Sequence, residues 1–239
     1  MADKTRDSLG DRMKSSYEDR TRVMLPRRTF TILRADGKSF HTLTRGCEKP
    51  YDPLIVAGMD AAMLAICEEA QGCTFGYAQS DEISVVLGDF QTIDTCAWFD
   101  GNMQKMVSVT ASVATAAFNE VTHGKLGRAL FDCRAFVVPD PVECENYYIW
   151  RQQDATRNSI QNLGHAHFSH KEMHGMSCPQ IQDALMARYS VNWNDRPVGD
   201  KRGRCAVYET GVGWRLDAEP PVFTQDREYL RSRLPVRKD

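Results

Sequence analysis

Residues 73–87 read CTFGYAQSDEISVVL, which is two short apolar runs joined by a polar turn. The first run, Cys73 to Ala78, predicts a short strand. The second, Ile83 to Leu87, predicts another strand because it is apolar and rich in β-branched residues. The tetrapeptide Gln79-Ser80-Asp81-Glu82 between them is polar, as turns usually are. The stretch therefore predicts two consecutive strands, and the elements on either side of them decide the fold.

Two segments before this stretch and two after it complete the pattern. Residues 29–35 alternate between apolar and polar and predict a strand, and residues 54–70 place apolar side chains at helical spacing. Residues 103–121 again show helical spacing, and residues 131–138, which end at a proline, predict a last strand. The order is β-α-β-β-α-β, which is typical of an α+β, ferredoxin-like domain.

The C-terminal part of the chain is expected to elaborate this core. We expect a core with an N-terminal extension over residues 1–140 and an elaboration over residues 141–239, packed together as one continuous domain. Within the elaboration, residues 142–162 and 181–189 predict helices. Residues 204–208 and 213–216 predict a hairpin, because a glycine-containing turn separates them.

Composition indicates an ordinary globular protein. The chain has 239 residues, is 42% hydrophobic, and has a formal net charge of −2. No apolar run reaches the roughly 18 residues of a membrane span, and the polar N-terminus does not resemble a secretory signal, so we expect a cytoplasmic protein that makes no membrane contact. The eight cysteines are scattered without a CxxC pair, which predicts buried, reduced thiols. Any RNA contact would need local basic clusters, for which the candidates are residues 27–28, 151–157 and 201–204.

Two carboxylates fall where the predicted strands meet. Asp36 follows the first strand, and Asp81 precedes the third. In a ferredoxin-like sheet the third strand lies antiparallel beside the first, so we expect these two residues to be neighbours at one edge. Carboxylate oxygens suit Mg²⁺, and two such ions can activate an attacking oxygen and stabilise a leaving one in phosphoryl transfer. Each fragment alone is more typical of a turn, and their joint placement favours a site.

The residue after Asp36 is Gly37, and it favours the same interpretation. Because it has no side chain, its backbone can approach a phosphate or a metal closely. The backbone amides that follow, as far as His41, could then form a cradle for a triphosphate.

At these residues the sequence resembles the tRNA-His guanylyltransferase superfamily. The similarity runs in order from about residue 7 to residue 209 and is specific as a combination rather than in any single piece. The matching segments are ILRADGKSFHTLT at 32–44, EKPYD at 48–52, FGYAQSDEISVVL at 75–87, FDCR at 131–134 and WRQQDATRNSI at 150–160. The resemblance implies a polymerase-type palm that adds nucleotides in the 3′→5′ direction, with a C-terminal helical and hairpin elaboration.

The resemblance also implies roles for individual residues. Asp36, Asp81 and the carbonyl of Gly37 are expected to bind two Mg²⁺ ions, with Glu82 as a third catalytic residue. GTP and ATP are the expected substrates, tRNA is the expected partner, and a homotetramer is the expected assembly. The residues expected to bind the nucleotide are Asp36, Gly37, Lys38, Ser39, Phe40, His41, Lys49, Ser80 and Lys105, and those expected to contact RNA are Arg134, Arg157 and Asn158.

One departure from the family indicates a branch. The enzymes that act on tRNA-His carry a His-led motif where this chain has Thr156 to Asn162, and the family often has an arginine where this chain has Asn102. The variant motif is similar to that of bacterial and archaeal guanylyltransferase-like proteins. Those are template-dependent polymerases that repair the 5′ end of truncated tRNA, and we expect the same activity here.

Three alternatives stay open. The protein could be a tRNA-His guanylyltransferase proper, or a nucleotide cyclase that uses the same palm and carboxylates. An RNA-binding module is disfavoured, because such modules stack bases on aromatic residues of the third strand and Ile83 to Leu87 contains none. The histidines between His165 and His174 could bind zinc if they share a helical face, although a polar face for RNA or another subunit is the preferred interpretation.

Overall fold

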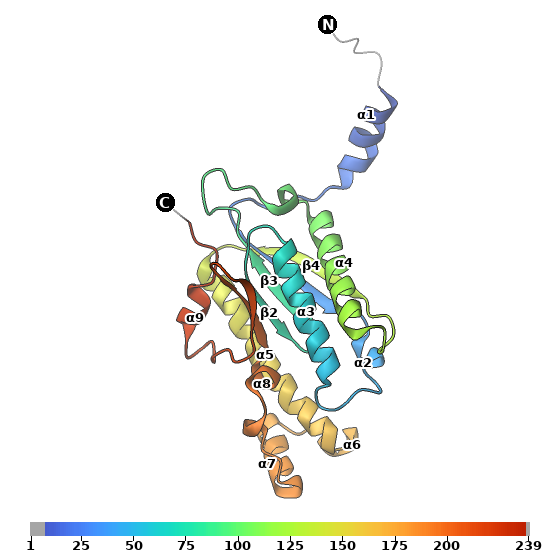
Figure 1. The fold of residues 1–239 in the computed structure, drawn as a ribbon, viewed down its shortest axis with the longest axis vertical. Coiled ribbons are helices and arrows are strands. Elements are labelled where there is room, and N and C mark those ends of the chain that lie inside the picture. The colour runs from blue at the N-terminus through green and yellow to red at the C-terminus, as the bar shows by residue number, and fades with distance from the viewer. Residues whose placement is uncertain (1–7, 238–239) are drawn as a thin grey trace.

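The structure is a computed structural model that describes residues 8–237, and its centre is one six-stranded antiparallel sheet (Figure 1). The order across the sheet is β4-β1-β3-β2-β5-β6. The strands are β1 (Phe30–Gly37), β2 (Cys73–Gln79), β3 (Glu82–Leu87), β4 (Phe131–Val138), β5 (Arg204–Glu209) and β6 (Gly213–Asp217). The first four have the ferredoxin-like order that the sequence predicts. The predicted hairpin β5–β6 also forms, and it continues the sheet by pairing with the edge of β2, which would otherwise be unpaired.

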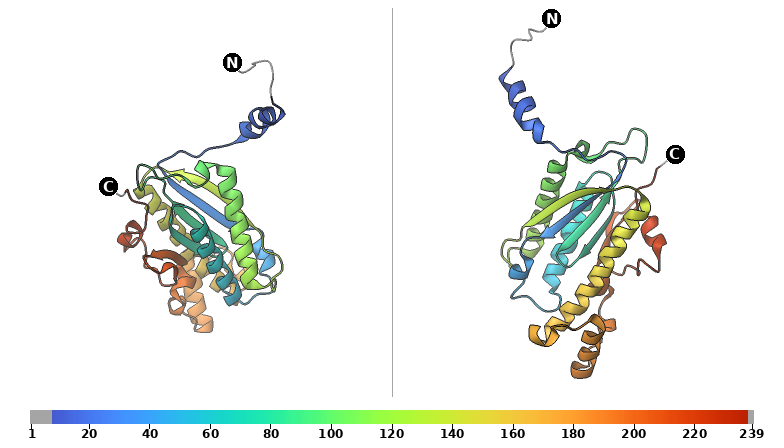
Figure 2. Two further views of the ribbon diagram at one scale, coloured as in Figure 1. Left: turned by 45° about the horizontal axis from the view of Figure 1, so that its top comes forward. Right: turned by 180° about the vertical axis from the view of Figure 1, so that it is seen from behind.

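Helices cover the two faces of the sheet differently. Helices α3 (Pro53–Glu69) and α4 (Met103–Thr122) pack on one face, and the long helix α5 (Pro141–His167) crosses the other (Figures 1 and 2). Each of the three begins at an N-cap residue whose side chain accepts a hydrogen bond from a backbone amide of the first turn, and these N-cap residues are Asp52, Asn102 and Asp140 respectively. None of the helices within residues 8–237 is both long and apolar enough to span a membrane.

Shorter helices connect these elements. The N-terminal segment consists of α1 (Leu9–Met13), a π-helical turn (Lys14–Glu18) and a 3-10 turn (Asp19–Thr21), and it extends away from the sheet (Figure 1). The remaining short elements are α2 (Phe40–Leu43), α6 (His170–Met173), α7 (Cys178–Tyr189), α8 (Val198–Arg202), α9 (Arg227–Arg231) and 3-10 turns at Trp98–Gly101 and Trp193–Asp195. Helices α6 and α7 form a small apolar cluster of their own with the end of α5.

The structure corrects two expectations about these segments. The histidine segment is not one helix, because α5 ends at His167 and α6 begins at His170, so the helical face on which zinc binding would depend does not form. All eight cysteines are free, as predicted, but only Cys67, Cys144 and Cys205 are buried.

Several side chains of the candidate basic clusters are paired within the protein. The guanidinium of Arg27 lies 2.5 Å from the carboxylate of Asp89, and that of Arg28 donates to backbone carbonyls of residues 92 and 93. Arg204 pairs with Asp60 at 2.5 Å inside the protein, and the ammonium of the buried Lys201 donates to a backbone carbonyl at 2.6 Å. These contacts hold the named side chains in the fold, and the RNA-binding role of the clusters stays a prediction.

Candidate active site

Asp36 and Asp81 meet where β1 ends and β3 begins, as the strand order predicts. Strand β1 continues one residue past Asp36, which lies opposite Glu82 of β3 and opposite Asp132 of β4. Asp81 is the turn residue just before β3, and its carbonyl accepts a hydrogen bond of 2.9 Å from the amide of Gly37. Asp36 is therefore fixed by strand pairing on both sides, and it is not in a turn as its Asp-Gly sequence suggests.

The electrostatics of this pair suit a hard cation. Burial raises the pKa of the Asp81 carboxyl, and the negative charge of Asp36 raises it further. A divalent cation between them would relieve that repulsion, and carboxylate and carbonyl oxygens are the ligands that Mg²⁺ prefers. Residues 8–237 hold no cluster of three or more His, Cys, Asp or Glu side chains for a metal. The other ligands would therefore be backbone carbonyls, water and substrate phosphates.

Glu82 has a different environment from the other two carboxylates. Its side chain lies 2.8 Å from Arg151 of α5 and 3.5 Å from Arg34 of β1, and all three side chains are largely buried. Burial raises the pKa of the Glu82 carboxyl, and the two guanidinium groups oppose that effect. Glu82 thus joins α5 to the sheet directly beside Asp36, and its predicted catalytic role stays a prediction.

The backbone after Asp36 is tightly packed. A Cβ atom on Gly37 would lie 2.3 Å from the ring of Phe40, which is buried against Phe118 and Phe131. The amide of Gly37 donates to the Asp81 carbonyl, and that of Lys38 donates to the carbonyl of residue 130 at 2.8 Å. Because these two amides are used by the protein, the predicted triphosphate cradle is restricted to residues 39–41.

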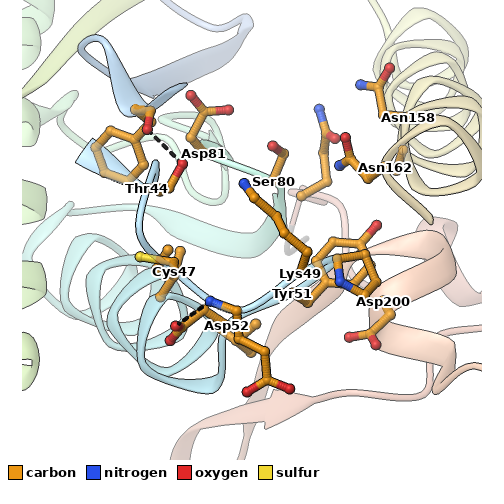
Figure 3. A pocket seen from close by; sticks show the side chains of 18 of the residues that line it. Thr44, Cys47, Lys49, Tyr51, Asp52, Ser80, Asp81, Asn158, Asn162 and Asp200 are labelled. Atoms are coloured by element: carbon orange, nitrogen blue, oxygen red, sulfur yellow. Dashed lines mark hydrogen bonds between the residues drawn. The ribbon is translucent and has the colours of Figure 1, made fainter. Parts of the chain in front are cut away.

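A cavity of about 360 Å³ opens beside the carboxylate edge (Figure 3). Its walls come from the β2–β3 turn, the loop before α3, the second half of α5, and α8. In Figure 3 the Lys49 side chain extends into this space toward the turn that carries Ser80 and Asp81. Of the predicted nucleotide-binding residues, the cavity is lined by Phe40, His41, Lys49 and Ser80, and it also reaches Asp81.

Most of the opposite wall of the cavity was missed by sequence reasoning. Helix α5 contributes Asn158, Asn162 and His165, and the loop before α3 contributes Tyr51. Burial raises the pKa of the Tyr51 phenol to about 12, and the nearby negative charge of Asp200 adds to this effect. The helical spacing 155-158-162-165 was a usable signal, because it places these side chains on one face of α5. Asn158, predicted to bind RNA, lies in this wall.

Other predicted residues lie outside the cavity. Lys105 is in the first turn of α4, and Met24, shortly before β1 begins, forms a β-bridge with Asn102 at the start of that helix. Lys105 is therefore at the opposite end of β1 from Asp36. Within a single copy of the protein, it does not line the cavity. Arg134 is exposed on β4, and Arg157 is exposed on α5, where it pairs with Asp154.

Comparison with known proteins agrees with this geometry. The family model described as tRNAHis guanylyltransferase matches residues 10–139. A bacterial tRNA(His) guanylyltransferase-like protein in complex with ATP is 42% identical, with a TM-score of 0.90 over 96% of this chain and 100% of that chain. A second such structure, in complex with GTP, is 39% identical with a TM-score of 0.81 over the same shares. The tRNA(His) guanylyltransferase of Schizosaccharomyces pombe is 28% identical over 218 residues, which are 82% of this chain and 81% of that protein.

The matched family segment contains β1, both central strands and the carboxylate edge, and the solved structures align over nearly the whole chain. The similarity therefore extends over the segments that form the site. From its sequence, its sheet and the carboxylates at the edge of that sheet, this chain belongs to the tRNAHis guanylyltransferase family of nucleotidyltransferases.

Proposed function

We propose that this protein adds nucleotides to the 5′ end of tRNA in the 3′→5′ direction, using a polymerase-type palm. The observation that carries the proposal is the pair Asp36 and Asp81 at the sheet edge, beside a cavity that Lys49 and Ser80 also line. A cavity of about 360 Å³ is in the range of small-ligand sites. The bacterial relatives with bound ATP and GTP support the same class of ligand.

Asp36, Asp81 and the carbonyl of Gly37 would hold Mg²⁺ in this site. Bound there, the two expected ions would activate the attacking oxygen and neutralise charge on the phosphates. Lys49 would place a positive charge against the triphosphate from the other side of the cavity, and the Ser80 hydroxyl would donate to it. Glu82, held by Arg151, keeps α5 and its polar cavity wall in position.

The reaction would take two steps. First, an oxygen of the RNA 5′-monophosphate attacks the α-phosphorus of ATP, so that a P–O bond forms, the α–β bond breaks, and pyrophosphate leaves. The product is a 5′-adenylylated RNA. Next, the 3′-hydroxyl of an incoming nucleoside triphosphate attacks the RNA 5′-phosphorus and loses its proton, and AMP leaves. The new nucleotide carries a triphosphate at the growing 5′ end.

The proposed substrate is a 5′-truncated tRNA whose opposing strand serves as template. The support is the replacement of the His-led motif by residues 156–162, which contribute Asn158 and Asn162 to the cavity. Watson–Crick pairing would supply discrimination, since a correct base closes a stacked helix end. The test is to offer truncated tRNAs with each of the four bases opposite the missing nucleotide. Addition that follows the opposing base supports repair, and guanosine added only to tRNA-His, whatever the opposing base, contradicts it.

A cyclase would use the same carboxylates, and one assay separates the two activities. Nucleoside triphosphate labelled at the α-phosphorus is incubated with Mg²⁺ and truncated tRNA, and the products are separated. The proposal predicts label in the tRNA. Label in a cyclic nucleotide, with none in tRNA, contradicts it.

A homotetramer is also part of the proposal. The exposed apolar side chains Leu9, Met13 and Tyr17 follow i, i+4, i+8 spacing on the N-terminal segment, which supplies an apolar stripe for a second copy. Light scattering on the purified protein gives the mass, and a monomer at assay concentration contradicts the expected assembly.

A further inference from the structure

Trp150 is an aromatic side chain that the fold fixes in place without covering it. It lies on α5 and is 51% exposed. The guanidinium of Arg151 lies over its ring at 4.2 Å from the centroid, and Tyr147 packs edge-on against it with centroids 6.0 Å apart. A single exposed aromatic is a common surface feature, so the surroundings of Trp150 decide whether it has a function.

The packing of α5 shows which way Trp150 points. On one side of the helix Tyr148 packs on Phe75 of β2, and on the other side Tyr147 packs on Phe136 of β4. With 3.6 residues per turn, Trp150 lies about 60° beyond Tyr147, on the side away from Tyr148. Trp150 therefore lies on the flank of α5 that borders β1 and β4.

The same ring is level with the carboxylate edge. Its neighbour Arg151 donates to Glu82 at 2.8 Å, and Glu82 is the strand partner of Asp36. Seen from behind, in the right-hand view of Figure 2, α5 crosses one part of the sheet, and no described helix covers β1 and β4 on that side. Arg134 is exposed on β4 there. Trp150 thus borders an open strand surface that leads to Asp36.

We propose that Trp150 is a stacking platform for the terminal base of the RNA end that receives the nucleotide, an inference that rests on the proposed function. Stacking there would hold the 5′-phosphate of that end beside Asp36. Arg134 on β4 and Arg157, two turns further along the same flank of α5, supply positive charge for phosphates of the same RNA end. Aromatic platforms of this kind accept every base, because each base has a π-face.

Because it accepts every base, Trp150 would contribute to RNA binding but not to the choice of nucleotide. A platform that contacts only the face of a base cannot distinguish bases, so the choice of nucleotide is left to pairing with the opposing strand. Trp150 would therefore strengthen RNA binding for all substrate sequences by the same factor, and it would leave triphosphate binding unchanged.

The test compares W150F, W150L and W150A with the wild type. The KM for truncated tRNA should rise roughly 5- to 150-fold in W150A, little in W150F, and nearly as much in W150L as in W150A, because leucine keeps apolar bulk but loses the ring. GTP affinity and the melting temperature should change little. Tyr208, which is 60% exposed on β5 at the other side of the sheet, provides the control variant Y208A, with unchanged KM.

A binding measurement separates this inference from the proposed function. The fluorescence of Trp150 is the difference between the emission of the wild type and that of W150F. A blunt-ended RNA hairpin with a 5′-monophosphate should quench it, whether or not catalysis occurs. A wild-type protein that adds no nucleotide contradicts the proposed function. The fluorescence quench then still shows whether Trp150 stacks on RNA. No quench at Trp150, equal effects of W150F and W150L, or a parallel loss of GTP affinity would each overturn the platform, since the last would show that Trp150 only supports Arg151.

Discussion

Replacing Gly37 by alanine should strain the site backbone while the rest of the fold persists. The added Cβ would lie 2.3, 2.5 and 2.7 Å from three atoms of the Phe40 ring, whereas ordinary contacts begin near 3.4 Å. The ring cannot retreat freely, because Phe118 and Phe131 pack on it with centroids 5.3 and 5.2 Å away. Overpacking of a core by one methyl group typically costs about 1–3 kcal/mol.

Thermal unfolding measures this cost. For a chain of this size, 1 kcal/mol corresponds to about 2–4 °C, so G37A should melt roughly 2–12 °C below the wild type. The rate of nucleotide addition by the folded G37A protein should also fall. The Gly37 amide donates to the Asp81 carbonyl, so displacement of Gly37 disturbs the carboxylate pair. The matched control is G46A, since a Cβ on Gly46 meets no atom within 4 Å, and its melting temperature should stay close to that of the wild type.

A double variant tests the stated cause. F40L removes part of the ring that the new methyl group meets, so G37A and F40L together should cost less than the sum of the two single changes, with a coupling of about 0.5–3 kcal/mol. Strictly additive effects would refute the steric explanation, and so would a G37A protein as stable and active as G46A.

Three further predictions concern the cavity and its support. Lys49→Ala should raise the KM for the triphosphate roughly 10- to 150-fold, because a charge-assisted hydrogen bond contributes about 1.5–3 kcal/mol. Arg151→Met should lower the free energy of unfolding by about 3–5 kcal/mol, since it leaves the buried Glu82 carboxylate without its 2.8 Å partner. Tyr51 has a pKa raised to about 12 in the folded protein, so the unfolded chain loses this proton first and stability should fall between about pH 10 and 12, less steeply in Y51F.

Each of these predictions has a matched control. Lys125, exposed beyond the end of α4, gives K125A with unchanged KM, and equal effects of K49A and K125A would argue against a phosphate contact. Chemical denaturation of R188M, which breaks an exposed pair with Glu172, should show a free energy of unfolding close to that of the wild type, and a similarly small change in R151M would contradict the buried-pair argument. Identical high-pH stability profiles for wild type and Y51F would refute the assignment to Tyr51.

Local sequence pattern was sufficient for the ferredoxin-like core. Strand and helix periods are properties of short segments, and the observed bounds differ from the predicted ones by at most about two residues. Two of the differences between prediction and structure have tertiary causes. Strand β1 includes Asp36 because β4 pairs with it there, and the β5–β6 hairpin joins the sheet because β2 offers an unpaired edge. Neither partner is visible in the local pattern.

Part of the candidate site was likewise predictable from the sequence, and part depends on tertiary packing. The approach of Asp36 and Asp81 follows from strand order alone, and it was predictable. The second cavity wall depends on how α5 packs across the sheet, so Asn162 and His165 were missed although their helical spacing was visible. Charge was the least informative signal, because a sequence shows that Arg204 is cationic and not that Asp60 neutralises it.

The most direct test of the account is nucleotide addition by variants of the two carboxylates. D36N and D81N are compared with the wild type and with D183N, a change at an exposed carboxylate on α7, by the transfer of labelled nucleotide to the 5′ end of truncated tRNA in Mg²⁺, with melting temperatures measured alongside. The account predicts that D36N and D81N fold normally and lose transfer by roughly 100-fold or more, while D183N retains it. Folded D36N or D81N with near-native transfer would contradict the claim that this pair carries the chemistry.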